Sequence, residues 1–385
     1  MIKVDLVKNT ITNNDIDTLI EWLKTYPRLT KGKLTIDFEK QWSKWLGCKY
    51  SVYVNSGSSA NMAMIYAMKC SGRLRNNKVI VPAVSWATTV SPVIQFGLEP
   101  VFCDCDKDTL GLDPVDLEYK LKTTGASTVI MVHALGLTCK IKEIKDICDM
   151  YNAVLIEDSC ETVNSTYNGI KTGNFGLMST FSYYFGHHAS TIEGGMICTD
   201  DPELRDMLVM LRSHGWDRDL EPTKQKELRE EHSVSDFKGM YTFYQPAFNI
   251  RSTDLQAFIG IEQLKKIDEM CDIRIKNYEL YNSLIKNEYW KPNPTPESTV
   301  SNFAYPIIHP LRDEISKVLF DNGIENRVLI SGNMANQPFC RHYKTERLYF
   351  AEIVDMYGMY IPNNPELDES DIIRISGIIN GVINE

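Results

Sequence analysis

The 385-residue sequence lacks the features that mark several protein classes. No apolar run approaches the roughly 20 residues that a membrane helix requires, and no secretory leader is visible from Met1 onward. Acidic residues outnumber basic ones by 51 to 41, and this negative balance argues against a surface for nucleic acid or anionic lipid. The ten cysteines do not form a disulfide framework, and the closest pair, Cys103 and Cys105, has no further ligands at metal-binding spacing. We therefore expect a cytoplasmic protein with reduced thiols and no metal site.

Short β-branched runs alternate with longer helical patterns over much of the chain. The expected strands cover residues 79–81, 101–102, 128–132 and 153–156. The expected helices cover residues 114–123 and 142–151. This alternation predicts an α/β fold with a mostly parallel sheet and helices on both faces. A long helical stretch over 253–285 and a proline-rich segment follow. We expect a large domain over 1–250, which includes the N-terminal segment, and a smaller α+β domain over 251–385.

Two adjacent histidines, His187 and His188, lie shortly before Glu193-Gly194-Gly195 in a part of the chain without lysine. An imidazole can accept and release protons near neutral pH, as a general acid or base does. A histidine near a strand can equally be a hydrogen-bonded core residue. Because neighbours in an extended segment point to opposite faces, we expect at most one of the pair to face a given pocket.

Three further features could bind a ligand that has an anionic group and a flat ring. Small residues over 55–61 precede a helical pattern, and free N–H groups at a helix start can hold a phosphate, although a plain N-cap gives the same pattern. Asp158 follows an expected strand, at the edge where open α/β sheets bind ligands; an N-cap is again the alternative. Trp86 could stack on a ring or belong to the core.

In combination these segments resemble the sugar-aminotransferase family of fold-type-I enzymes, which use pyridoxal phosphate (PLP). The matching segments, in the family's order, are Gly32, Phe38-Glu39, 55–61, 81–86, 102–106, 157–161, 182–195, 248–251, 261–264, 326–327 and 360–363. In the family a lysine that binds the cofactor covalently lies five residues after a serine and six before Glu-Gly-Gly. Here His187 occupies that position, between Ser182 and Glu193, and no lysine lies between Lys171 and Lys224. The resemblance implies an aminotransferase-like fold without the covalent anchor.

The resemblance also implies how the cofactor is held. The backbone groups of Gly57 and Ser58 and the hydroxyl of Ser182 bind the PLP phosphate. Trp86 stacks on the ring, and Asp158 pairs with the ring nitrogen, which lets the ring accept electrons.

Other matching residues imply a shared site and contacts with substrate. Glu161 lies beside the cofactor, and Asn249 reaches the phosphate in the neighbouring subunit, which implies a homodimer with composite active sites. The residues expected to approach the substrate are His188, His214, Arg218 and Arg327.

A branch of the family that carries histidine in the lysine position removes the C3 hydroxyl of nucleotide-linked 4-keto-6-deoxy sugars. The resemblance to it implies GDP-4-keto-6-deoxymannose as substrate, on the route to colitose of surface polysaccharide, and L-glutamate as the donor that converts PLP to pyridoxamine phosphate (PMP). Another histidine-bearing branch carries an iron–sulfur cluster on cysteines downstream of the histidine. Here only Cys198, Cys271 and Cys340 lie downstream, far apart, so we expect no cluster.

In this interpretation His187 is the catalytic base that starts the elimination. Two alternatives remain open. The first is a nucleotide-sugar aminotransferase in which another group serves as the base. The second is a protein of PLP-enzyme fold that binds a sugar nucleotide or a partner without turnover. Asp158, Ser182 and Asn249, which are all present, argue against the second alternative.

Overall fold

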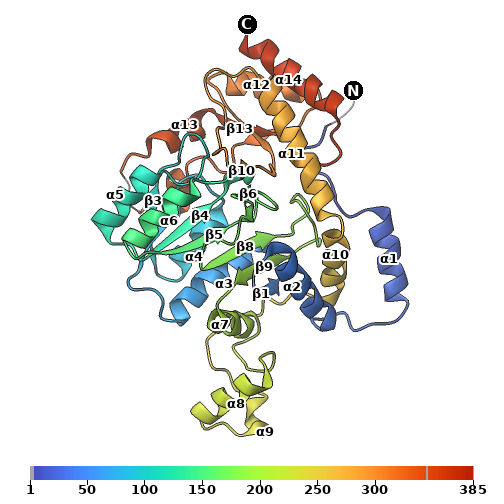
Figure 1. Ribbon diagram of the computed structural model, residues 1–385, viewed down its shortest axis with the longest axis vertical. Helices are drawn as coiled ribbons and strands as arrows, with labels where there is room; N and C mark the ends of the chain where they lie inside the picture. The colour runs from blue at the N-terminus through green and yellow to red at the C-terminus, as the bar shows by residue number, and fades with distance from the viewer. Residues whose placement is uncertain (1–3, 344–345, 385) are drawn as a thin grey trace.

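A seven-stranded sheet forms the centre of the computed structural model, which describes residues 4–343 and 346–384 (Figure 1). Its strands are β1 (Tyr50–Val54), β2 (Lys78–Pro82), β3 (Glu99–Cys103), β4 (Thr128–Val132), β5 (Val154–Asp158), β8 (Met178–Ser182) and β9 (Gly195–Thr199). They lie in the order β1-β9-β8-β5-β4-β2-β3. The pairs that β9 makes with β1 and β8 are antiparallel, and the remaining neighbours are parallel. The mostly parallel α/β sheet expected from the sequence is confirmed.

Side chains of the central strands alternate between two buried layers. Val79 and Val81 belong to the buried cluster that also contains residues of α3 (Gly57–Cys70), α4 (Ala87–Gln95) and α7 (Pro202–Arg212). Ile80, which lies between them, packs with α5 (Pro114–Thr124) and α6 (Ile141–Met150) on the other face. Strands that are covered on both faces need apolar residues at successive positions, which explains the continuous apolar runs in the sequence.

Two N-terminal helices, α1 (Asn13–Leu23) and α2 (Lys33–Leu46), lie beside α10 (Asp254–Leu264). No side chain at the N-cap of α2 satisfies its first N–H groups, since that position is Gly32. The Asp254 carboxylate does so from α10: it accepts from the N–H groups of Gly32 at 2.7 Å and Thr35 at 3.0 Å, and from the Thr35 hydroxyl at 2.8 Å. One buried carboxylate thereby joins the start of α2 to the start of α10.

The helical stretch expected over 253–285 is confirmed, and it consists of two helices. The first is α10, and α11 (Ile267–Leu284) follows after a break at Lys266. The Lys266 ammonium donates to the carbonyl of Thr10 at 2.9 Å and pairs with Asp15. The break therefore lies where the chain is held by contacts with the N-terminal segment.

The C-terminal part is built around a small antiparallel sheet in the order β11-β13-β12. Its elements are β11 (Tyr305–Ile308), α12 (Arg312–Asp321), β12 (Arg327–Val328), α13 (Tyr349–Tyr357), β13 (Gly358–Ile361) and α14 (Glu369–Ile383). Short elements complete the fold: β6 (Thr166–Tyr167), β7 (Ile170–Lys171), β10 (Ser298–Thr299), η1 (Ala134–Gly136), η2 (Met334–Asn336) and η3 (Pro338–Cys340).

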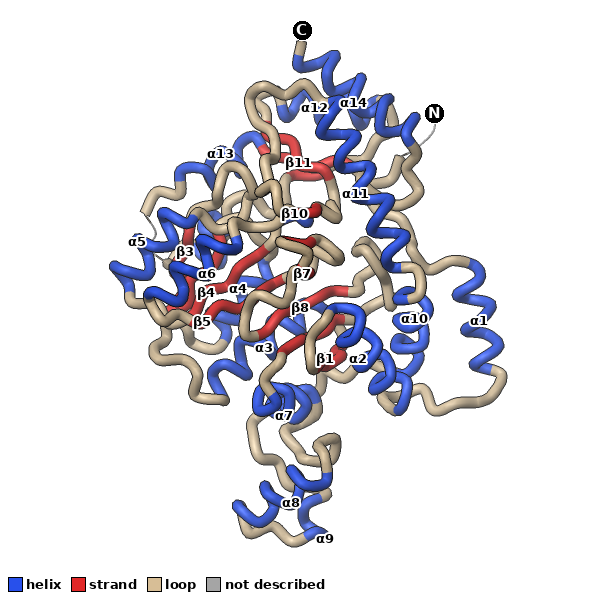
Figure 2. Tube along the Cα trace, viewed as in Figure 1, coloured by secondary structure: helices blue, strands red, loops and turns tan. Residues whose placement is uncertain are grey.

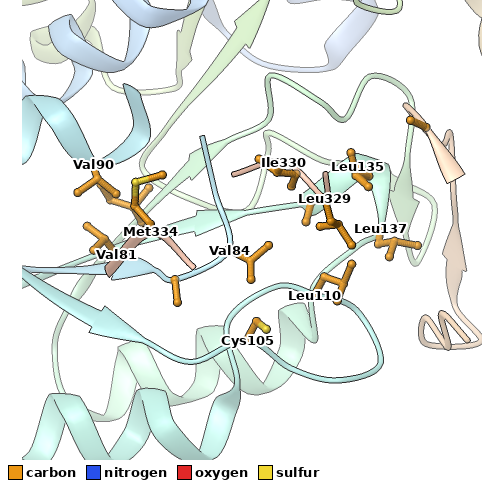
Figure 3. Close-up of a cluster of buried hydrophobic side chains, with 14 of the residues drawn as sticks. Val81, Val84, Val90, Cys105, Leu110, Leu135, Leu137, Leu329, Ile330 and Met334 are labelled. Carbon is orange, nitrogen blue, oxygen red and sulfur yellow. The ribbon is translucent and has the colours of Figure 1, made fainter. Parts of the chain in front are cut away.

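Buried side chains join the small sheet to the large one. Figure 3 shows Leu329 and Met334 from the C-terminal part in one apolar cluster with Val81 of β2 and Val84 of the loop after it. The Met334 N–H donates to the Ala83 carbonyl at 2.8 Å. This core contains residues from both sides of position 250. The domain boundary that we expect near this position therefore stays a prediction.

The segment with α8 (Pro222–Glu231) and α9 (Asp236–Gly239) projects away from the sheet (Figure 2). None of the side chains of α8 is buried. In the part of the chain that the structure describes, no helix is long and apolar enough to cross a membrane.

We expect Asp254→Ala to lower the free energy of unfolding by about 2 kcal/mol, because several donors at the start of α2 lose one buried acceptor. Urea unfolding measures this change. The matched control is Asp272→Ala, an exposed carboxylate on α11, which should stay within about 0.5 kcal/mol of the parent. Equal stability of the two variants would contradict the capping role of Asp254.

Candidate active site

A cavity of about 310 Å³ opens where several parallel strands of the large sheet end. Val132, Asp158 and Ser182 are the last residues of β4, β5 and β8, and each lines it. Phe303 and Tyr360 line it from the C-terminal part. The remaining lining residues are Ser56, Gly57, Ser58, Asn61, Trp86, Thr88, Thr89, Cys160, Glu161, Tyr184, His187, Glu193 and Arg327.

The start of α3 forms an anion cradle in this cavity. Ser56 caps the helix by accepting from the N–H of Ser59 at 3.0 Å, while the N–H groups of Gly57 and Ser58 have no acceptor within the helix. A Cβ atom at Gly57 would lie 2.6 Å from the Cβ of Ser182, so only glycine lets α3 approach the end of β8 this closely. The Ser182 hydroxyl thus lies beside two free N–H groups, an arrangement that suits a phosphate.

The Asp158 carboxylate lies at the wall of the cavity and is held from several elements. Its Oδ2 accepts from Asn61 of α3 and Thr89 of α4, both at 2.7 Å, and its Oδ1 accepts from the Cys160 N–H at 3.2 Å. Thr180 donates to Asn61 Oδ1 at 2.5 Å and so fixes the orientation of the amide. These donors fix the position of the carboxylate at the cavity wall, and a carboxylate oxygen can accept more than one hydrogen bond.

Trp86 presents a flat face at the cavity rather than filling the core. Its side chain is 57% exposed at the N-cap of α4. The alternative of a core aromatic is therefore excluded, and a stacking role on a ring stays a prediction.

His187 has a defined tautomer and faces the cavity. Its Nδ1 lies 2.8 Å from the carbonyl oxygen of Cys160, which can only accept, so Nδ1 carries the proton and Nε2 is the free base. Burial lowers the pKa of His187 to about 4, because the charged imidazolium loses hydration. The imidazole is therefore neutral at physiological pH, and a proton that it gains is easily given away.

His188 lies outside the cavity, contrary to the expectation that it contacts substrate. It is fully buried, and its Nε2 is 3.0 Å from the Ser301 carbonyl oxygen. Only one of the two histidines faces the cavity, as expected. The backbone at this point is a series of bends, however, and not the extended segment on which the expectation rested. His188 is thus a packing residue that joins this loop to the segment before β11.

A second carboxyl group, Glu161, lies in the same cavity. Its Oε2 accepts from the Leu135 N–H at 2.9 Å. Burial raises the pKa of Glu161 to about 7, and the charge of Asp158 acts in the same direction. Glu161 can therefore be protonated near neutral pH.

Arg327 brings a cation to the cavity from the C-terminal sheet. It pairs with Glu325 at 3.1 Å, and its neighbour on the sheet, Tyr360, lines the cavity beside it. A guanidinium at this wall can bind an anionic group of a ligand.

Three predicted residues lie together but away from the cavity. His214 packs against Trp216 with ring centres 4.9 Å apart, and the Arg218 guanidinium lies 4.0 Å from the Trp216 ring centre. Asn249 accepts from the Arg251 side chain at 2.9 Å. Within one chain the structure does not bring these residues to His187, and their predicted approach to a neighbouring subunit's site stays a prediction.

The sequence model of the DegT/DnrJ/EryC1/StrS aminotransferase family matches residues 9–380. The chain belongs to this family. A GDP-4-keto-6-deoxy-D-mannose 3-dehydratase of Yersinia pseudotuberculosis is 34% identical over 357 residues, which cover 90% of this chain and 90% of that protein. The protein of the same name from Escherichia coli O55:H7 is 36% identical over 360 residues, which cover 90% of this chain and 92% of that protein.

A solved structure of the same enzyme type resembles the whole chain. It is a GDP-4-keto-6-deoxymannose-3-dehydratase with a trapped PLP-glutamate geminal diamine. Its sequence identity is 30%, its TM-score is 0.87, and the superposition covers 98% of this chain and all of that one. The fold-type-I aminotransferase architecture predicted from the sequence is confirmed.

Several lining residues of this family member were not predicted from sequence. Asn61 and Thr89 hold Asp158 but carry no charge, and Phe303 comes from a loop without a recognisable pattern. Glu193 and Tyr360 lie in segments that match the family, which was the signal available for them. Among the described residues, no group of three His, Cys, Asp or Glu side chains could hold a metal ion.

We expect the imidazole of His187 to titrate near pH 4, well below the ordinary value of about 6.5, because burial disfavours its charged form. NMR of protein labelled at histidine Cε1, with His187→Asn to assign the signal, measures this pKa. A midpoint at or above 6.5 would show that the cavity does not desolvate the ring.

Proposed function

We propose that this protein is a PLP- and PMP-dependent dehydratase that removes the C3 hydroxyl of a GDP-linked 4-keto-6-deoxy sugar, GDP-4-keto-6-deoxymannose. The observation that carries the proposal is the neutral His187 in a cavity whose described lining contains no lysine. L-glutamate is the amino donor. This assignment rests on the related enzymes, one of which was trapped with PLP and glutamate.

The cavity fits the cofactor at each of its chemical groups. The N–H groups of Gly57 and Ser58 and the Ser182 hydroxyl bind its phosphate, where a Cβ atom at residue 57 would fill the space. Trp86 covers a face of its ring, and Asp158 accepts from the ring nitrogen. When bound, PMP supplies an electron-accepting ring that can stabilise charge left after proton removal.

His187 acts as base and then as acid in the elimination. Its Nε2 removes a proton from the cofactor's methylene carbon, since the ring is neutral and Nδ1 is occupied by Cys160. The same environment that lowers its pKa to about 4 makes the protonated ring a strong acid. It therefore gives the proton to the C3 hydroxyl, which leaves as water. The nitrogen that PMP supplied to C4 of the sugar is then released by hydrolysis as ammonia, which leaves a 3-deoxy-4-keto sugar.

The hydrogen bond that holds the His187 ring also disfavours amine transfer. An aminotransferase lysine carries its proton between two carbons on a long flexible chain, whereas His187 is tied to the Cys160 carbonyl and packs against Phe303 with ring centres 5.2 Å apart. Without a mobile proton donor at the substrate carbon, loss of the C3 hydroxyl is the open route.

The active form is a homodimer in this proposal. Asn249, His214 and Arg218 gather on one chain outside its own cavity, beside the projecting α8 and α9. These residues complete the site of the neighbouring subunit, with Asn249 at the cofactor phosphate and the His214 and Arg218 side chains at the sugar nucleotide.

The proposal predicts a 3-deoxy-4-keto sugar and ammonia from protein incubated with PLP, L-glutamate and GDP-4-keto-6-deoxymannose, and neither product without glutamate. Mass spectrometry and an ammonia assay follow the products. His187→Lys should lower dehydration at least about 100-fold and give a borohydride-reducible PLP adduct, while the exposed control His232→Gln should do neither. A stable 4-amino sugar without 3-deoxy product would instead identify an aminotransferase.

Thr89→Val should reduce PLP affinity and dehydration about 10-fold, because it keeps the side-chain shape but removes a donor from the charged Asp158. PLP titration followed by absorbance, together with the product assay, measures both quantities. Ser91→Ala is the control on the same helix, since Ser91 donates only to the carbonyl of Ala87. Unchanged affinity and rate in Thr89→Val would show that Asp158 needs no such support.

A further inference from the structure

Two thiols meet at one serine, at the far end of the β1–β9 pair from the active-site cavity. Ser51 on β1 is the register partner of Cys198 on β9, and its hydroxyl oxygen lies 3.4 Å from the Cys198 sulfur. The same oxygen is 3.7 Å from the sulfur of Cys48, in the turn that joins α2 to β1. Ser43 contacts the Ser51 hydroxyl at 2.7 Å and fixes it from α2. Both sulfur atoms therefore lie around one hydroxyl group.

This cluster opens to a separate cavity. Cys48 and Cys198 both line a hollow of about 420 Å³, which shares no lining residue with the active-site cavity. Asp200 and Asp201 contribute charge on one side, so the hollow admits a small neutral reagent more readily than a large anion. Lys44 and Lys49 lie by Cys48 in a neighbouring crevice.

The two thiols differ in acidity in the way that a reactive pair requires. Neighbouring polar groups, the Cys198 thiol first and the Ser51 and Ser43 hydroxyls after it, lower the pKa of Cys48, while burial and the charge of Asp200 oppose this change. Burial raises the pKa of Cys198 well above its ordinary range. The Cys48 thiol is thus the more acidic of the two, and Cys198 is the less acidic neighbour.

The other partly exposed thiols provide a comparison. Cys70 and Cys160 are half-buried like Cys48, and burial raises the pKa of each. The remaining seven cysteines, Cys198 among them, are buried. Exposure alone therefore does not single out Cys48, whereas exposure together with its hydrogen-bonded neighbours does.

We propose that Cys48 and Cys198 form a peroxide-sensitive dithiol site, with Cys48 as the attacking sulfur and Cys198 as the resolving one. The Cys48 thiolate attacks one oxygen of hydrogen peroxide, the O–O bond breaks, and hydroxide leaves from a sulfenic acid. The Cys198 sulfur then displaces the sulfenic hydroxyl, and the departing oxygen and the thiol proton form water. In total, two thiols are oxidised to one disulfide and one peroxide is reduced to two waters.

Forming this bond requires a local adjustment at Cys48. Cys198 is fixed in β9, but Cys48 follows Gly47, which ends α2 in a left-handed conformation (φ 95°), so the attacking residue lies in a turn. The bond requires the Ser51 hydroxyl to move from between the sulfur atoms. It would join the α2–β1 turn to β9 across the edge of the large sheet.

The first test is alkylation of the full-length, PLP-saturated protein with iodoacetamide at pH 7, followed by peptide mass spectrometry. Cys48 should react about 10-fold faster than Cys70, because its larger thiolate fraction outweighs the lower nucleophilicity of a more acidic thiol. A rate for Cys48 no higher than that for Cys70 or Cys160 would overturn the assignment of Cys48 as the attacking sulfur.

The second test is exposure to hydrogen peroxide followed by non-reducing peptide mapping. A linked Cys48–Cys198 peptide is expected; Cys198→Ser should leave a dimedone-trappable sulfenic acid at Cys48, and Cys70→Ser should behave as the parent. If Cys198→Ser does not fold, the sulfenic acid is trapped in Cys198→Ala instead. The peptide map of the parent protein then shows whether the Cys48–Cys198 link forms. Absence of the linked peptide in the parent, or links between other pairs alone, would contradict the proposal.

Discussion

The hydrogen bond between His187 Nδ1 and the Cys160 carbonyl determines what the active-site cavity can do. It fixes the tautomer, aims the basic nitrogen at the cavity and prevents the ring from swinging. Desolvation by the surrounding protein lowers the pKa of the imidazole, so the ring is neutral at physiological pH, as the proposed base requires. A mobile lysine amine at this position would add a covalent anchor and a proton shuttle, and the fold omits both.

The rest of the fold supplies fixed groups around this ring. Parallel strands end at one edge and place Asp158 and Ser182 beside each other, and the start of α3 approaches closely because residue 57 is glycine. Asn61 and Thr89 hold Asp158 from two helices. The small C-terminal sheet packs on the large one and brings Arg327 and Tyr360 to the opposite wall. Each contribution comes from a different element, so the site depends on the packing of the whole chain.

Much of this arrangement could be predicted from the sequence, for physical reasons. Buried parallel strands need continuous apolar runs, and these located β2 to β5. Asp158 stood out because it follows an expected strand, and His187 because it occupies the lysine position of a segment that resembles the family's. The neutral donors Asn61 and Thr89 could not be distinguished from ordinary helix residues, and Phe303 lies far along the chain in a loop. The two histidines could be separated by spacing, but only the contact with Ser301 showed that His188 is buried. The break at Lys266 depends on contacts with Thr10 and Asp15 that no local pattern contains.

The central claim is that His187 itself removes the proton that starts water loss. The most direct measurement is the single-turnover rate of 3-deoxy sugar formation with PMP that carries deuterium on its methylene carbon, compared with ordinary PMP. The account predicts slower formation with deuterium in the parent protein and no formation in His187→Asn. An equal rate with both cofactors, together with undiminished product in His187→Asn, would contradict it.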